Sequence, residues 1–141
     1  MSLRIFLAIL VATLACGEIE EAPDKPAAKS YLPSMDVNIV GYEDFSEGGR
    51  NRFLARAVLV TDKIPDPGIV EHVARAIWNK RGEGWDDFTV LVYLQGMNTK
   101  AAAWGTGEFS RDAPPKFSTD EKALLNTKYW AQTEQAKKKG S

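Results

Sequence analysis

Four segments of this chain carry apolar residues at alternate positions, the pattern of strands that bury one face of a sheet. They are residues 37–42, 53–60, 88–94 and 101–109, and the third has the strongest strand pattern. Gly48 and Gly49 lie between the first two segments and supply a turn, so these two are expected to form a hairpin. The pattern therefore predicts four strands.

Between the second and third strands, apolar residues recur at helical spacing. Asp66 is the expected N-cap of this helix, and Pro67 suits its first position because the missing N–H would have no partner there. The helix is expected to end at Gly82 or Gly84.

A second helix is expected after the two consecutive prolines at 114–115, which break the chain. Ser118 and Glu121 have the spacing of a capping box, and the helix is expected to reach about residue 136. The order ββαββα predicts an α+β fold, a mixed four-stranded sheet with both helices packed on one face.

Composition agrees with a single folded domain, expected at residues 35–137 and followed by a disordered tail at 138–141. The chain is 44% hydrophobic with four tryptophans, and roughly 100 residues can bury a core without disulfides. Its formal net charge of −1 gives no electrostatic footprint for nucleic acid.

The longest apolar run is at the N-terminus, where Arg4 precedes residues 5–15 and Cys16 follows them. A short basic start, a brief apolar stretch and small residues at its end form a secretory signal. Cys16 is the only cysteine, and with Ala15 before it the junction resembles the lipobox of bacterial lipoproteins. That resemblance implies a signal peptide at 1–16 and a lipid anchor on Cys16, which attaches the protein to the membrane of the bacterial envelope.

Two alternatives to the lipid anchor remain at this junction. Thr13 stands where such signals carry an aliphatic residue, so an ordinary signal cleaved after Ala15 or Gly17 would give a soluble secreted or periplasmic protein. An uncleaved N-terminal segment is the other alternative. An aspartate directly after the cysteine would resemble an inner-membrane retention signal. This chain has Gly17 at that position, which favours the outer membrane in a host with two membranes.

Residues 17–34 read as a flexible tether between the anchor and the domain. They are rich in Pro, Ala, Glu and Lys, a composition that cannot bury a core. Cleavage of the signal would remove Arg4. The remaining chain would then carry 17 basic and 19 acidic residues, a formal net charge near −2 (17 minus 19).

No motif predicts a catalytic residue, a cofactor or a metal site. His72 is the only histidine, and the pattern places it on the first helix with no nucleophile near it in sequence. With one histidine and no cysteine after position 16, a zinc site of the usual N/S type is not expected. Asp86 and Asp87 are adjacent at a strand start, so their side chains should point to opposite faces.

The segment from residue 85 to 109 carries the candidate binding residues. The link at 95–100 is longer than a tight hairpin needs, and such loops often bind partners. The candidates are Trp85, Tyr93, Gln95, Met97, Asn98, Lys100 and Trp104. Gly105 and Gly107 share a strand face, which requires the close approach of either a helix of this domain, the favoured choice, or a ligand. This segment resembles small exported bacterial domains, and the resemblance carries over no catalytic residue.

Two functions from different classes follow. The first is a membrane-tethered, non-enzymatic binding module whose partner is an envelope protein or a glycan. The alternative is a small hydrolase of envelope polymers that uses a pair of Asp or Glu carboxylates gathered by the fold.

The anchor is tested by metabolic labelling with a radioactive fatty acid, followed by membrane fractionation. We expect the wild-type chain to be labelled and to sediment with membranes, and Cys16→Ser to be unlabelled because it lacks the thiol that accepts lipid. An unlabelled, soluble wild-type chain would contradict the lipoprotein prediction.

Overall fold

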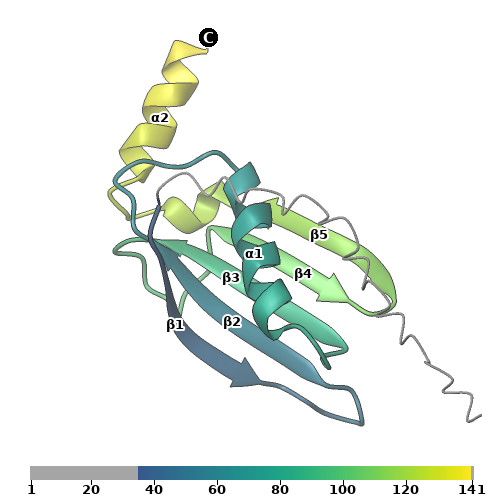
Figure 1. Ribbon diagram of the computed structural model, residues 1–141. Helices are drawn as coiled ribbons and strands as arrows, with labels where there is room; N and C mark the ends of the chain where they lie inside the picture. The colour runs from purple at the N-terminus through teal and green to yellow at the C-terminus, as the bar shows by residue number, and fades with distance from the viewer. Residues whose placement is uncertain (1–34, 141) are drawn as a thin grey trace, which may run out of the picture.

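The computed structural model describes residues 35–140, which form one mixed sheet, two α-helices and a short 3₁₀ helix (Figure 1). The elements in chain order are β1 (Val37–Asp44), β2 (Arg52–Leu59), α1 (Gly68–Arg81), β3 (Asp87–Leu94), β4 (Gly105–Ser110), β5 (Ala113–Thr119), η1 (Glu121–Leu124) and α2 (Trp130–Lys139). The expected signal at 1–16, with Cys16, and the tether at 17–34 lie outside the described residues.

The five strands lie side by side in chain order, β1-β2-β3-β4-β5. Strands β2 and β3 are parallel and joined by α1, and the other three pairs are antiparallel. The predicted α+β class and mixed sheet are therefore confirmed. The four-stranded sheet in ββαββα order is wrong, because a fifth strand precedes the C-terminal helical segments.

Strand β5 forms where the prolines at 114–115 were expected only to break the chain. Proline lacks a ladder donor and is confined to positions such as the outer strand of a sheet, which is where β5 lies. Ser118 belongs to this strand and caps no helix. Asp120 caps η1 instead, since its Oδ1 accepts from the N–H of Lys122 at 2.9 Å.

The predicted boundaries of α1 are close to those observed. The carboxylate of Asp66 accepts from the N–H of Gly68 at 2.7 Å, so it satisfies an orphan donor of the first turn as expected, although the helix begins one residue later than predicted. At the other end, the N–H of Gly82 donates to the carbonyl of Trp78.

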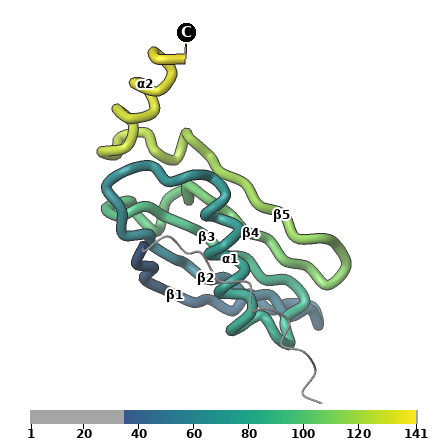
Figure 2. Tube along the Cα trace, turned by 45° about the horizontal axis from the view of Figure 1, so that its top comes forward, coloured from purple at the N-terminus to yellow at the C-terminus, as the bar shows by residue number. Residues whose placement is uncertain are grey.

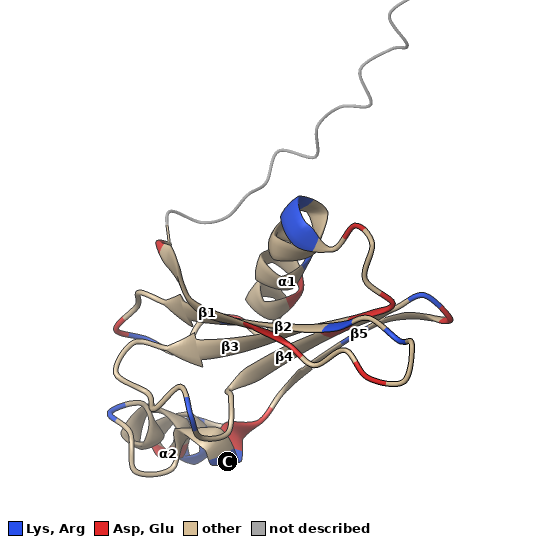
Figure 3. Cartoon of the chain, turned by 90° about the horizontal axis from the view of Figure 1, so that it is seen from below, with Lys and Arg blue, Asp and Glu red and all other residues tan. Residues whose placement is uncertain are grey.

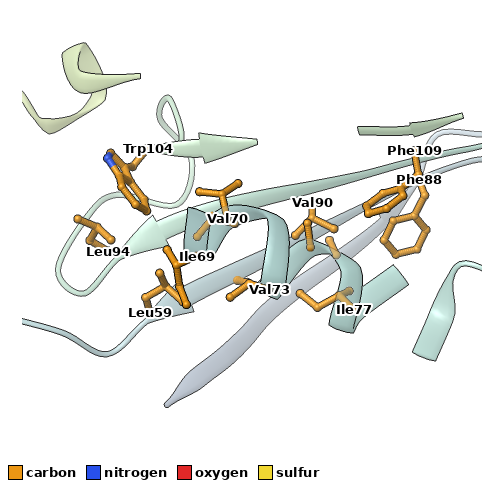
Figure 4. Close-up of a cluster of buried hydrophobic side chains, with 14 of the residues drawn as sticks. Leu59, Ile69, Val70, Val73, Ile77, Phe88, Val90, Leu94, Trp104 and Phe109 are labelled. Atoms are coloured by element: carbon orange, nitrogen blue, oxygen red, sulfur yellow. The ribbon is translucent and has the colours of Figure 1, made fainter. Parts of the chain in front are cut away.

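The core lies between α1 and the sheet, where α1 packs chiefly over β3 and β4 (Figure 4). Apolar side chains on one face of the helix meet the inward side chains of the strands. The largest fully buried residues include Phe88, Leu59, Leu94, Val70 and Val90.

Helix α1 approaches β4 closely because that strand presents two glycines to it. A Cβ added to Gly107 would overlap the Cβ of Ala74, and one added to Gly105 would overlap a methyl group of Val70. The small-residue face thus receives a helix of the same domain.

Helix α2 does not share that face, which corrects the prediction that both helices cover one side. Figure 3 shows the sheet nearly edge-on, with α1 on one side and α2 on the other, at one end of the strands. Within residues 35–140, neither helix has the length and apolar character that crossing a bilayer requires.

Gly107→Ala should lower the free energy of unfolding by about 1–3 kcal/mol, because the new methyl group forces α1 away from β4. Urea titration measures this change. Gly41→Ala is the matched control, since a Cβ there meets nothing within 4 Å, and its effect should stay within about 0.5 kcal/mol.

The cause is isolated by adding Ala74→Gly, which removes the atom that the new methyl group meets. Alone, this change should cost about 1 kcal/mol of helix stability. In the Gly107→Ala background it should cost less. Additive losses would show that helix–strand contact is not the reason.

Candidate functional site

A cleft of about 600 Å³ opens where the connection after β3 faces the segment between η1 and α2. One wall comes from residues 95–102 and the other from residues 123–129. Three predicted binding residues, Gln95, Met97 and Asn98, line it. The cleft therefore lies at the loop that sequence analysis selected.

The first wall begins with a tight turn at the end of β3. The N–H of Met97 donates to the carbonyl of Leu94 at 3.0 Å, and Gly96 has a φ of +88°. A type II turn requires a positive φ at its third residue, which glycine adopts without strain. The turn directs Met97 back over the strand end, where its sulfur lies 3.2 Å from the N–H of Leu94.

The second wall follows η1 and was predicted as part of a continuous helix. Asn126 interrupts it with a φ of 64°, the left-handed conformation that asparagine tolerates better than most residues. The Thr127 hydroxyl then donates to the carbonyl of Leu124 at 2.6 Å. This break turns Leu125 and Asn126 toward the cleft. No periodicity in the sequence signalled it.

Tyr129, in the second wall, is linked to the first wall by a hydrogen bond from its hydroxyl to Gln95. Its ring is fully buried, and its hydroxyl lies 2.7 Å from the carbonyl oxygen of Thr61 and 3.0 Å from that of Gln95. The single hydroxyl proton is shared between these two acceptors. Burial raises the pKa of this phenol above its usual value, so it remains a neutral donor.

The rim of the cleft carries amides that the fold does not use. Within residues 35–140, the side-chain amides of Gln95 and Asn126 form no hydrogen bond, and both residues are exposed. Leu125 lies beside them with 48% of its surface exposed. Unpartnered amides around apolar surface suit recognition of a ligand with its own donors and acceptors.

The charges in the cleft do not suit acid–base chemistry. Of the described residues that line it, none is Asp or Glu and one is a cation, Lys128, which pairs with Asp62 at 2.8 Å. A general acid or base must lie within hydrogen-bond reach of the reacting group. The arrangement supports binding.

The other predicted binding residues lie elsewhere. Trp104 is 2% exposed and belongs to the core, and Tyr93 is buried with its hydroxyl directed to the carbonyl of Ala101 at 3.2 Å. Trp85 precedes β3 and so lies at the opposite end of the strand from the cleft. Lys100 is exposed but does not line the cleft.

A second polar cluster, at the opposite end of the strands, holds loops together. Arg50 donates to both carboxylate oxygens of Asp87, at 2.5 and 2.9 Å, and reaches Asp112 at 3.1 Å. Hydrogen bonds from Arg50 and Ser110 hold the pKa of Asp87 well below its usual value. This saturated network links the β1–β2 and β4–β5 turns to the start of β3.

The structure also places His72 and tests for a metal site. Exposed His72 places Nδ1 2.9 Å from the carbonyl of Gly68, one turn earlier in α1. Among the described residues, no three His, Cys, Asp or Glu side chains are grouped so that they could hold a metal ion.

No protein-family model, curated protein or solved structure matches this chain. The geometry of the cleft and the sequence therefore carry what can be inferred about function.

Tyr129→Phe should lower the free energy of unfolding by about 1–3 kcal/mol, because the partly buried carbonyl groups of Thr61 and Gln95 lose their donor. Amide hydrogen exchange in residues 95–102 should also accelerate as that wall loosens. Tyr42→Phe is the control, since the Tyr42 hydroxyl has no hydrogen bond among the described residues. Equal losses for the two variants would contradict the linking role.

The raised pKa of Tyr129 predicts an alkaline loss of stability. The neutral phenol is favoured in the folded chain, so its contribution is complete below the unfolded pKa of about 10 and is lost as pH rises through the folded value. Urea titrations from pH 8 upward should show the wild-type chain and Tyr129→Phe converging above about pH 10. A constant difference would contradict this assignment.

Proposed function

We propose that this protein is an envelope lipoprotein that acts as a non-enzymatic binding module, and that its cleft takes a polypeptide segment of an envelope partner. The single observation that supports this is the cleft between residues 95–102 and 123–129, with its apolar surface and its unpartnered amides. The lipid anchor depends on the sequence around Cys16.

The chemistry of the walls favours a polypeptide over a glycan. Sugar-binding sites commonly offer the exposed face of an aromatic ring, on which the apolar face of a sugar can stack. Within the part of the chain that the structure describes, Tyr129 is the only aromatic residue lining this cleft, and its ring is buried. Amide side chains such as Gln95 and Asn126 instead match the N–H and C=O groups of a peptide backbone.

The anchor and the cleft serve one purpose in this proposal. A lipid on Cys16 would hold the chain at the membrane, and residues 17–34 would let the domain reach a partner within the length of the tether. Confinement near the membrane raises the effective concentration of the domain at its partner, so a modest intrinsic affinity suffices. Among residues 35–140, no carboxylate lines this cleft, so the cleft lends the hydrolase alternative no support.

The proposal is tested by photo-crosslinking in living cells. A photoreactive phenylalanine analogue replaces Leu125, which is exposed and lines the cleft. We expect a specific adduct whose size muramidase leaves unchanged. The same analogue at Glu83, exposed and outside the cleft, serves as the control.

The amides are tested by combining Gln95→Ala with Asn126→Gly, because glycine adopts a positive φ readily. The adduct at position 125 should decrease at least about tenfold, as expected when binding residues are lost. Asn79→Ala with Gln135→Ala removes two exposed amides elsewhere and should leave the adduct unchanged. No adduct above the Glu83 control, or an adduct whose size muramidase reduces, would contradict the proposal.

A further inference from the structure

The two outer strands of the sheet, visible in Figure 2, differ in how they are protected. An outer strand exposes unpaired backbone groups, and natural proteins commonly block such an edge with proline or lysine. Strand β5 carries Pro114, Pro115 and Lys116. Strand β1 has the sequence VNIVGYED, with neither residue type. The β5 edge is therefore blocked by proline and lysine, whereas the β1 edge lacks both.

Exposed apolar side chains gather at the β1 edge. Among the described residues, four of the five exposed large hydrophobic residues belong to β1 or directly follow it: Ile39, Val40, Tyr42 and Phe45. Val40 leaves 52% of its surface exposed and lies at a bulge in the pairing with β2. Single exposed apolar residues are ordinary, but four within one short segment make it a candidate interaction surface.

The backbone of β1 directs hydrogen-bonding groups outward beside these side chains. The carbonyl of Asp36 accepts from the N–H of Val60, and the N–H of Phe45 donates to the carbonyl of Arg52. Along a strand, the backbone N–H and C=O groups of successive residues point alternately to its two sides. The extra residue at the bulge, Val40, shifts this alternation by one position. The N–H and C=O groups of Val37, Ile39, Tyr42 and Asp44 therefore point away from β2.

An apolar groove lies directly beside this edge. Its volume is about 170 Å³, and it is lined by Val37, Ile39, Tyr42, Val73, Ala76, Ile77 and Lys80. It exists because α1 packs over β3, β4 and β5 and leaves the β1 side of that face less covered. Three of the four residues with outward backbone groups, Val37, Ile39 and Tyr42, thus also form one wall of the groove.

Charge distinguishes the possible occupants of this edge. Asp36 and Asp44 lie at the two ends of β1, and neither forms an ion pair within residues 35–140. Two copies of β1 paired antiparallel through their outward groups would place Asp44 of one copy opposite Val37 of the other and so beside its Asp36, and like charges at such close positions are destabilising. Hydrogen bonds from Ser46 lower the pKa of Asp44, which keeps that charge in place. A strand with basic ends suits this edge better than a second copy does.

We propose that β1 accepts an extended segment of another protein as a sixth strand, with large apolar residues of that segment entering the groove between β1 and α1 and basic residues flanking them. In strand addition, backbone hydrogen bonds supply affinity and side-chain pockets supply specificity. The surface shares no residue with the cleft of the proposed function. Either site can therefore fail without the other.

The test uses the intact chain and a fluorescent peptide of alternating valine and threonine with lysine at each end. We expect saturable binding by fluorescence anisotropy, and slower amide hydrogen exchange across Val37–Asp44 when peptide is present. A peptide with proline at its centre should not bind, because it cannot complete the ladder. Failure of the first peptide to bind would overturn the proposal.

The groove is tested by Ala76→Leu, which fills it without altering β1. Peptide affinity should fall at least tenfold, equivalent to about 1.4 kcal/mol. Asn79→Leu adds a comparable side chain at an exposed position of α1 outside the groove and should leave affinity unchanged. Equal affinities for Ala76→Leu and wild type would overturn the role of the groove.

Hydrogen exchange of the chain without peptide separates the other occupants. Slow exchange at the outward amides of Ile39 and Tyr42, independent of peptide, would show that a second copy or the chain's own N-terminal segment already covers the edge. Sedimentation equilibrium would distinguish these two, since only the second copy changes the mass. Either result would overturn the proposal.

Discussion

The contact between α1 and the two glycines of β4 is the constraint on which the rest of this structure depends. Gly105 and Gly107 let the helix backbone approach the strand, with Val70 and Ala74 occupying the space where side chains would stand. Helix α1 is also the crossover that makes β2 and β3 parallel. Its position therefore fixes the layer that buries the core, and interiors packed at this density leave little freedom to shift.

The two candidate binding surfaces have separate structural causes. Because α1 packs over β3, β4 and β5, it leaves the groove beside β1. At the C-terminal end of β3, Tyr129 ties Gln95 to Thr61, so the cleft walls are anchored to the strand ends by one buried hydroxyl. The two candidate binding surfaces thus lie on separate parts of one rigid framework, and both use groups that the core does not need.

The sequence indicated the loop that lines the cleft but not the residues opposite it. Gln95, Met97 and Asn98 follow a strongly apolar strand, so a polar loop was expected there. Trp104 and Tyr93 were grouped with them because aromatic residues are common in interfaces, yet the fold buries both. Burial depends on which elements pack above a residue. The opposite wall was missed because the positive φ of Asn126 has no periodic signature.

The sequence by itself determined the α+β class, the hairpin, α1 with its ends and the need for a close approach at Gly105 and Gly107, because periodicity, caps and glycine act locally. Only the tertiary structure decided that residues 113–119 form a fifth strand. The prolines at 114–115 forbid a central strand but permit an outer one, and the position of a strand in the sheet is a long-range property. The tertiary structure alone also brought residues 95–102 against residues 123–129, since the hydrogen bonds of Tyr129 join segments far apart in the chain.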